Sequence, residues 1–349
     1  MTAEREIFLV LAKGVLGLRT NVAGFNWSYG TNVPPTTHKE YEACAVRLTL
    51  RVGQVQPPPE IQSHGKYHYF SGEPGADGLY YQRRFLLHAQ LQLEAKGLLS
   101  EEPCLSVNKT YYRFISHRFM NLHSVGYILT DLAGLLLLRH GYAPLHCSAF
   151  RKGNSTIVIF APPNTGKTLT TMMACMEHGA EFLAEDLAIT DGRTVYSVPW
   201  TSTFRYYSQV DRSFVSRTVN ALTRLFPPLE LLPIGKPKPV NAYVESNKLS
   251  DKSRITHLAI LERGSVSVQQ ENQEEAFRKI TNLNRYEFNY HKAPLIVAYE
   301  FFNPALNIEA ACKAEQDILK ALVTNVRERL LVRTDDAKKY TSLILGALK

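Results

Sequence analysis

The chain is poor in cysteine, and its five cysteines lie far apart, with no C-x-x-C pair and no His/Cys cluster at zinc-binding spacing. A disulfide framework and a structural zinc are therefore excluded, and reduced thiols in a cytoplasmic protein are expected. Long hydrophobic runs are also missing, since residues 125–138 contain Asp131 and fall short of the roughly 20 residues that cross a bilayer. The apolar residues 7–11 follow Glu4 and Glu6 without a small-residue cleavage site, so neither membrane insertion nor export is predicted.

Neither sign of charge dominates, because 40 Lys and Arg face 32 Asp and Glu, which gives a net charge of +8. This balance attracts anionic partners such as nucleotides, acidic peptides or nucleic acid without choosing among them. The sequence contains no run of five basic residues and no nucleic-acid-binding motif, so a nucleic-acid partner is not favoured. The length of 349 residues and the 45% of apolar residues predict a globular protein of two domains, or of one large domain with an appendage.

The first part of the chain, residues 1–120, is rich in strand patterns. Apolar and polar residues alternate from Val46 to Val52, the period of a half-buried strand, and the aromatic-rich residues 110–115 are a further strand candidate. From residue 121 the pattern changes to a helix over 124–139. We therefore predict a strand-rich N-terminal domain over 1–120, in which acceptor recognition is expected, and a second domain over 121–349.

The second part predicts an α/β domain, α+β for the chain overall, with an antiparallel contribution. The expected strands cover residues 145–150, 156–160, 182–189, 194–198 and 255–261, and the expected helices cover 167–178, 210–225, 308–323 and 335–348. The proline-rich residues 227–239 predict a long irregular segment, which is either a surface connection or a substrate flap.

One segment carries a recognisable chemical motif. It matches the relaxed phosphate-loop pattern, in which four free positions precede Gly-Lys-Thr, and it lies between an apolar strand and a helix as such a loop requires. Backbone N–H groups and the helix N-terminus would hold phosphates, the lysine would reach the outer phosphates, and the threonine hydroxyl would ligate magnesium. The candidate nucleotide-binding residues are Ala161, Pro162, Pro163, Asn164, Thr165, Gly166, Lys167, Thr168 and Leu169.

The loop departs from the glycine-rich ideal. Pro162 and Pro163 have no N–H group to donate. Asn164 stands where many such loops have glycine, and asparagine is the residue that best tolerates a positive φ after glycine.

Two adjacent carboxylates, Glu185 and Asp186, interrupt the apolar residues 182–190, eighteen residues beyond Lys167. Burial of carboxylates is costly unless they bind a cation or hydrogen-bond donors, so a magnesium site beside the phosphates is predicted, with a strand end in solvent as the alternative. Strand alternation sends the two side chains to opposite faces, so that one can hold the metal while the other abstracts a proton. The sequence does not decide between them.

His146 and Cys147, taken alone, indicate buried structural residues. The combination of residues 145–150, the phosphate loop and residues 179–186, however, resembles the catalytic domain of HPr kinase/phosphorylase and its HPr-kinase-like relatives. The resemblance implies a phosphoenolpyruvate-carboxykinase-like P-loop domain with a mixed sheet. It also implies phosphoryl transfer from ATP with Mg²⁺ to a serine hydroxyl of a protein or peptide, and a homo-oligomer.

Carried over residue by residue, the resemblance implies that Lys167 holds the β and γ phosphates and that Thr168 and Asp186 serve magnesium. Glu185 stands at the family's catalytic aspartate, one methylene longer, and His146 matches the family's active-site histidine, so the base remains open between Glu185 and Asp186. Arg205 is either a stabiliser of the transferring phosphoryl group or an ordinary surface arginine.

The family's downstream signature is not recognisable, which favours a kinase-like relative whose acceptor is a peptide or a small hydroxylated molecule rather than HPr. Three alternatives stay open: a P-loop ATPase or ATP-sensing regulator, a non-catalytic relative, and a nucleic-acid-binding protein with a secondary ATP site.

Overall fold

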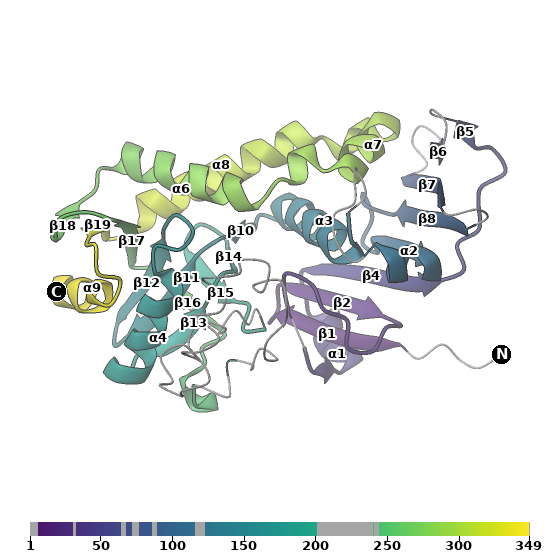
Figure 1. Ribbon diagram of the computed structural model, residues 1–349. Helices are drawn as coiled ribbons and strands as arrows, with labels where there is room; N and C mark the ends of the chain where they lie inside the picture. The colour runs from purple at the N-terminus through teal and green to yellow at the C-terminus, as the bar shows by residue number, and fades with distance from the viewer. Residues whose placement is uncertain are drawn as a thin grey trace, which may run out of the picture.

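The protein mixes helices and strands in an α+β arrangement, and its described residues form three sheets (Figure 1). The computed structural model describes residues 6–30, 33–63, 68–71, 77–85, 89–115, 123–200, 240 and 244–348. No helix within these residues is both long enough and apolar enough to cross a membrane.

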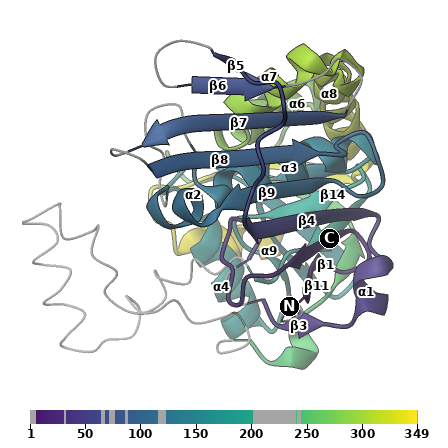
Figure 2. The ribbon, with the colours of Figure 1, turned by 90° about the vertical axis from the view of Figure 1, so that its right-hand side faces the viewer.

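The N-terminal part forms a mixed nine-stranded sheet of order β3-β1-β2-β4-β9-β8-β7-β6-β5 (Figure 2). Its strands are β1 (Ile7–Ala12), β2 (Leu16–Thr20), β3 (Pro35–Thr36), β4 (Val46–Gly53), β5 (Gln62–Ser63), β6 (His68–Ser71), β7 (Gly78–Phe85), β8 (Ala89–Lys96) and β9 (Cys104–Asn108). The alternating segment is β4, as predicted, and β4 lies parallel to both β2 and β9. The short helix α1 (His38–Glu42) connects β3 to β4.

The expectation of a strand over residues 110–115 was wrong, because Lys109–Phe114 form the helix α2. The Asn108 side chain accepts a hydrogen bond of 2.8 Å from the backbone N–H of Tyr111 and so caps the helix. This cap outweighs the strand preference of the aromatic residues.

The second part contains a six-stranded sheet of order β13-β11-β12-β17-β19-β18 and a four-stranded sheet of order β10-β14-β15-β16. Their strands are β10 (Ala143–Leu145), β11 (Ser148–Lys152), β12 (Ser155–Phe160), β13 (Glu181–Ala184), β14 (Ala188–Thr190), β15 (Thr194–Ser197), β16 (Lys252–Arg254), β17 (His257–Glu262), β18 (Ser267–Gln270) and β19 (Glu328–Arg333). Strands β12, β17 and β19 are parallel, so their carboxyl ends meet at one edge.

Helices cover these sheets and join them to the N-terminal sheet (Figure 1). They are α3 (Val125–Arg139), α4 (Lys167–His178), α6 (Gln273–Glu287), α7 (Pro294–Phe302), α8 (Ile308–Asn325) and α9 (Lys339–Ala347), with short 3₁₀ turns η4 (Ser246–Lys248), η5 (Tyr290–Lys292) and η6 (Pro304–Leu306). The predicted helices over 124–139, 167–178 and 308–323 are confirmed as α3, α4 and α8, and α3 is capped by Ser124.

The largest hydrophobic core crosses the predicted boundary near residue 120. Apolar residues of β1, β2, β4, β8 and β9 share this core with α3, η5, α7 and the start of α8. Leu132 and Leu136 of α3 are fully or almost fully buried within it. The division at residue 120 remains a prediction, while the packing shows that α3 belongs to the core of the N-terminal sheet.

Two predicted strands are each divided between two sheets. Residues 145–150 break at His146 and Cys147, so that Leu145 ends β10 and Ser148 begins β11. Residues 182–189 break at 185–187, where Asp186 has a φ of 72°. The expectation of continuous strands was therefore wrong at the two points where the chain passes from one sheet to the other.

Candidate active site

The candidate phosphate loop lies where sequence reasoning placed it, between β12 and α4. It sits at the carboxyl edge of the parallel strands, the usual ligand-binding edge of such sheets. Residues that follow β17 and β19 contact the loop. Arg263 donates a hydrogen bond of 3.1 Å from Nη2 to the Asn164 carbonyl. Ala337 packs so close to Gly166 that a Cβ added to this glycine would lie 3.1 Å from the Cβ of Ala337. The positive φ expected for Asn164 is confirmed at 60°.

The N–H groups that could bind a phosphate lie at the start of helix α4 rather than in the first half of the loop. Pro162, Pro163 and Asn164 are exposed, and the Thr165 N–H donates to the Pro162 carbonyl. Helix α4 begins after Gly166 without a side-chain cap, so the N–H groups of its first turn point outward, a geometry that suits an anion. Ala161 is buried, while Thr168 and Leu169 are half-buried.

Lys167, the first residue of α4, is a buried charged residue of the candidate phosphate loop. Its side chain is buried, and its Nζ has no hydrogen-bond partner among the described residues. Burial lowers the pKa of this ammonium group, and the negative charges of Asp186, Glu287 and Glu185 oppose that shift. A buried cation without a hydrogen-bond partner is costly, and a phosphate group would supply both acceptor atoms and negative charge.

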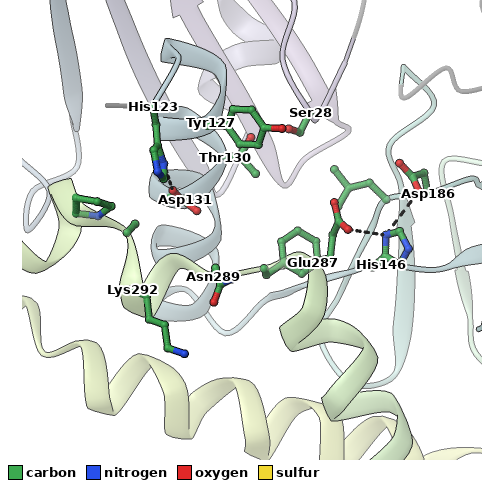
Figure 3. A pocket seen from close by; sticks show the side chains of 14 residues that line it. Ser28, His123, Tyr127, Thr130, Asp131, His146, Asp186, Glu287, Asn289 and Lys292 are labelled. Atoms are coloured by element: carbon green, nitrogen blue, oxygen red, sulfur yellow. Dashed lines mark ion pairs between the residues drawn. The ribbon is translucent and has the colours of Figure 1, made fainter. Parts of the chain in front are cut away.

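The two sheet crossings bring His146 and Asp186 together. Leu145 pairs with Ala188 in one sheet and Ala149 with Ala184 in the other, so the residues between these pairs face each other. The Nδ1 atom of His146 lies 3.6 Å from Oδ1 of Asp186 and 3.8 Å from Oε2 of Glu287, the last residue of α6 (Figure 3). The tertiary structure thus gathers three titratable groups beside the phosphate loop.

These groups perturb one another. Burial, and to a lesser extent the positive charge of Lys167, lowers the pKa of His146 to about 4, although the negative charge of Asp186 raises it. The imidazole is therefore neutral near pH 7. Burial and the charge of Asp186 raise the pKa of Glu287. Burial raises the pKa of the Cys147 thiol to about 12, which makes a nucleophilic role unsuitable.

The two adjacent carboxylates have different surroundings. The Glu185 residue is completely buried, whereas the Asp186 side chain is 43% exposed and lines a pocket. The left-handed backbone of Asp186 turns the chain at this point, so the two side chains leave in different directions. Of the pair, Asp186 is the carboxylate that a substrate in the pocket can reach.

A buried amide holds the crossing in place. Asn284 of α6 accepts a hydrogen bond of 3.1 Å from the backbone N–H of His146, and its Nδ2 donates to the Pro144 carbonyl at 3.1 Å and to Oε1 of Glu315 at 2.7 Å. Asn284 is fully buried. This amide links α6 and α8 to the chain at Pro144 and His146, where β10 ends.

Sequence reasoning missed most of the pocket next to these residues. The pocket has a volume of about 440 Å³ and reaches from His146 and Asp186 to α3. Its lining is Ser28, His123, Tyr127, Thr130, Asp131, His146, Asp186, Leu187, Glu287, Phe288, Asn289, Lys292, Ala293 and Pro294. The sequence offered one hint of this pocket, the polar Asp131 within an apolar helix. The other lining residues come from separate segments of the chain that share no motif.

The residues that would hold magnesium are few. Within the described part of the chain, no group of three or more His, Cys, Asp or Glu side chains is placed to bind a metal ion. Magnesium usually keeps several waters and takes one or two carboxylates together with substrate phosphates. The half-buried Thr168 at the start of α4, together with one of the two adjacent carboxylates, Glu185 or Asp186, would fit that mode, in which the nucleotide supplies the remaining ligands.

Some predicted features lie outside the described residues. These are Arg205, the helix over 210–225 and the proline-rich residues 227–239.

No protein-family model matches the sequence, and no curated protein matches it either.

Proposed function

We propose that the chain is an ATP- and Mg²⁺-dependent kinase of HPr-kinase-like type, which transfers the γ-phosphoryl group to a hydroxyl of an acceptor in the adjoining pocket. The observation that carries the proposal is Lys167, a buried ammonium group without a hydrogen-bond partner among the described residues, at the uncapped N-terminus of α4. The phosphate-loop spacing and the parallel strands β12 and β17 support the phosphoenolpyruvate-carboxykinase-like fold as part of the same proposal.

The roles of the residues follow from their positions. Lys167 and the N–H groups of the first turn of α4 neutralise and orient the outer phosphates. Thr168 and one of the two adjacent carboxylates hold magnesium, which when bound neutralises phosphate charge. The other carboxylate takes the proton of the acceptor hydroxyl, and its exposure in the pocket favours Asp186 for this step.

The pocket favours phosphoryl transfer over simple hydrolysis. It begins at Asp186, His146 and Glu287 and is large enough for an organic acceptor, whereas an ATPase needs only space for water. His146, neutral near pH 7, donates or accepts a hydrogen bond without adding positive charge beside Asp186.

The test is nucleotide binding by calorimetry and turnover in the presence of magnesium. Lys167→Ala is expected to weaken ATP binding at least about tenfold, because the phosphates lose a charge-assisted hydrogen bond. The matched control is Lys320→Ala on the exposed face of α8. Unchanged ATP affinity in Lys167→Ala, or no ATP binding by the native protein at millimolar concentration, would overturn the proposal.

The two carboxylates are tested separately. Asp186→Asn is expected to keep ATP binding and lose acceptor-stimulated turnover. The same result in Glu185→Gln, with activity retained by Asp186→Asn, would assign the proton transfer to Glu185 instead.

A further inference from the structure

The pocket beside the candidate phosphate loop has two polar ends. One end holds His146, Asp186 and Glu287, and the other holds the pair His123 and Asp131, whose Nδ1 and Oδ2 atoms are 4.0 Å apart (Figure 3). The far end plays no part in the chemistry of phosphoryl transfer. It therefore needs an explanation of its own.

The far end contains a carboxylate that is largely desolvated. Asp131 lies in the middle of α3 between core residues, and its side chain is only 19% exposed. Burial raises the pKa of this carboxyl to about 7. A desolvated carboxylate destabilises the native state unless a cation or hydrogen-bond donor reaches it, and here the side chain borders the pocket.

The charge of the lining favours a cationic ligand. Among the described residues, three carboxylates line the pocket, those of Asp131, Asp186 and Glu287. The lysine of the lining, Lys292, is exposed, and its side chain extends away from the other labelled side chains (Figure 3). A cationic acceptor would offset the charge of Asp131, whereas an anionic acceptor would be repelled.

The remaining walls suit a small hydroxylated molecule. Tyr127 and Phe288 provide aromatic surface, while Ser28, Thr130 and Asn289 provide hydroxyl and amide groups. The volume of about 440 Å³ lies within the roughly 300–1,000 Å³ of small-molecule sites. A protein acceptor that inserted only a serine side chain would leave the far end empty.

We infer that this pocket binds the phosphoryl acceptor and that the acceptor is a small hydroxylated amine, with its ammonium group at Asp131 and its reacting hydroxyl at Asp186. This inference rests on the proposed kinase activity and names its substrate class. In the transfer, the bond from the γ-phosphorus to the β–γ bridging oxygen breaks and a bond to the acceptor oxygen forms. The hydroxyl proton moves to the Asp186 carboxylate, and ADP and the phosphorylated amine leave.

The experiment uses the full chain with ATP and magnesium, and it measures ADP formation and binding of the probes. The probes are matched sets that differ only in the amine, such as glucosamine, N-acetylglucosamine and glucose, or 3-amino-1,2-propanediol and glycerol. The variants are Asp131→Asn, which keeps the shape of the side chain, and the exposed control Asp317→Asn on α8. Thermal unfolding checks that each variant folds.

We expect at least one amine to bind and to stimulate ADP formation about tenfold more than its neutral counterpart, as one charge-assisted hydrogen bond predicts. Asp131→Asn should lose this preference and keep ATP binding, whereas Asp317→Asn should keep both. If neutral and cationic probes are equivalent, if no amine binds or stimulates, or if Asp131→Asn keeps the preference, the inference is overturned. In any of these cases, ATP binding that still depends on Lys167 would show that the proposed kinase function survives the loss of this inference.

Discussion

Asp131 links the stability of the protein to pH. Its pKa, raised by burial to about 7, lies above the ordinary value of 3.8, so between these values the native state holds a proton that the unfolded chain has released. The free energy of unfolding therefore falls as the pH rises through this window and is lowest above it. His123 lies 4.0 Å from Asp131, and burial, followed by the charge of Asp131, raises the pKa of Tyr29.

We predict that Asp131→Asn raises the free energy of unfolding at about pH 8 by an amount on the order of 2 kcal/mol and changes it little near pH 4, because the amide cannot ionise. Urea unfolding at about pH 4 and pH 8 measures the difference. The exposed Asp317→Asn should match the stability of the native protein at both pH values. Equal stabilities of Asp131→Asn and the native protein at pH 8 would mean that the Asp131 carboxylate is already compensated.

Asn164 shows how a non-glycine residue can serve in a tight phosphate loop. With φ at 60°, it occupies the left-handed region, which costs a β-branched residue roughly 1–2 kcal/mol and glycine nothing. We predict that Asn164→Gly retains both stability and ATP affinity, whereas Asn164→Val loses on the order of 1 kcal/mol of stability and part of the affinity. Thermal unfolding and calorimetric titration measure both. Equal behaviour of the two variants would show that the loop relaxes out of this conformation.

The candidate site lies where two segments of the chain pass from one sheet to the other, between β10 and β11 and between β13 and β14. The two breaks lie opposite each other. Each pair changes sheet where its polar residues lie, His146 in one and Glu185 and Asp186 in the other. Asn284 stabilises the first break from α6. The site is thus a junction between elements rather than the end of a single strand.

Asn284→Leu is expected to lower the free energy of unfolding by about 3 kcal/mol and to reduce turnover. Leucine removes three hydrogen bonds and leaves the buried Glu315 carboxylate and the Pro144 carbonyl without this donor. Asn282→Leu, two residues earlier on the exposed side of α6, is the control and should change stability little. Urea unfolding together with ADP formation would show whether the two effects occur together, and a stable Asn284→Leu variant would contradict the assigned role of the amide.

The large shared core favours cooperative unfolding of the molecule. Strands of the N-terminal sheet, α3 and η5 bury their apolar side chains together, and Trp200 donates a hydrogen bond of 3.1 Å to the Val10 carbonyl. We predict a single unfolding transition in which tryptophan fluorescence and far-ultraviolet circular dichroism coincide. Two separated transitions would show instead that the parts on either side of residue 120 unfold independently.

Local patterns in the sequence were sufficient for elements whose signals are local. Helices α3, α4 and α8, strand β4 and the strand-loop-helix order around Lys167 follow from side-chain period, capping residues and turn residues within a short stretch. The positive φ of Asn164 follows from the intrinsic preference of asparagine. The helix at 109–114 was missed because one capping asparagine outweighed a run of aromatic residues.

The arrangement of those elements depended on tertiary packing. An apolar run such as 182–189 looks the same whether it continues in one sheet or changes sheet in the middle, because both choices bury its side chains. Glu287 and Asp131 came to the same pocket as Asp186 only when α6 and α3 packed against the sheets. The sequence alone determined the motif and its local backbone. The pocket, its second polar end and the contact of His146 with two carboxylates required three-dimensional packing, since they bring together separate segments of the chain, such as those of His146 and Glu287.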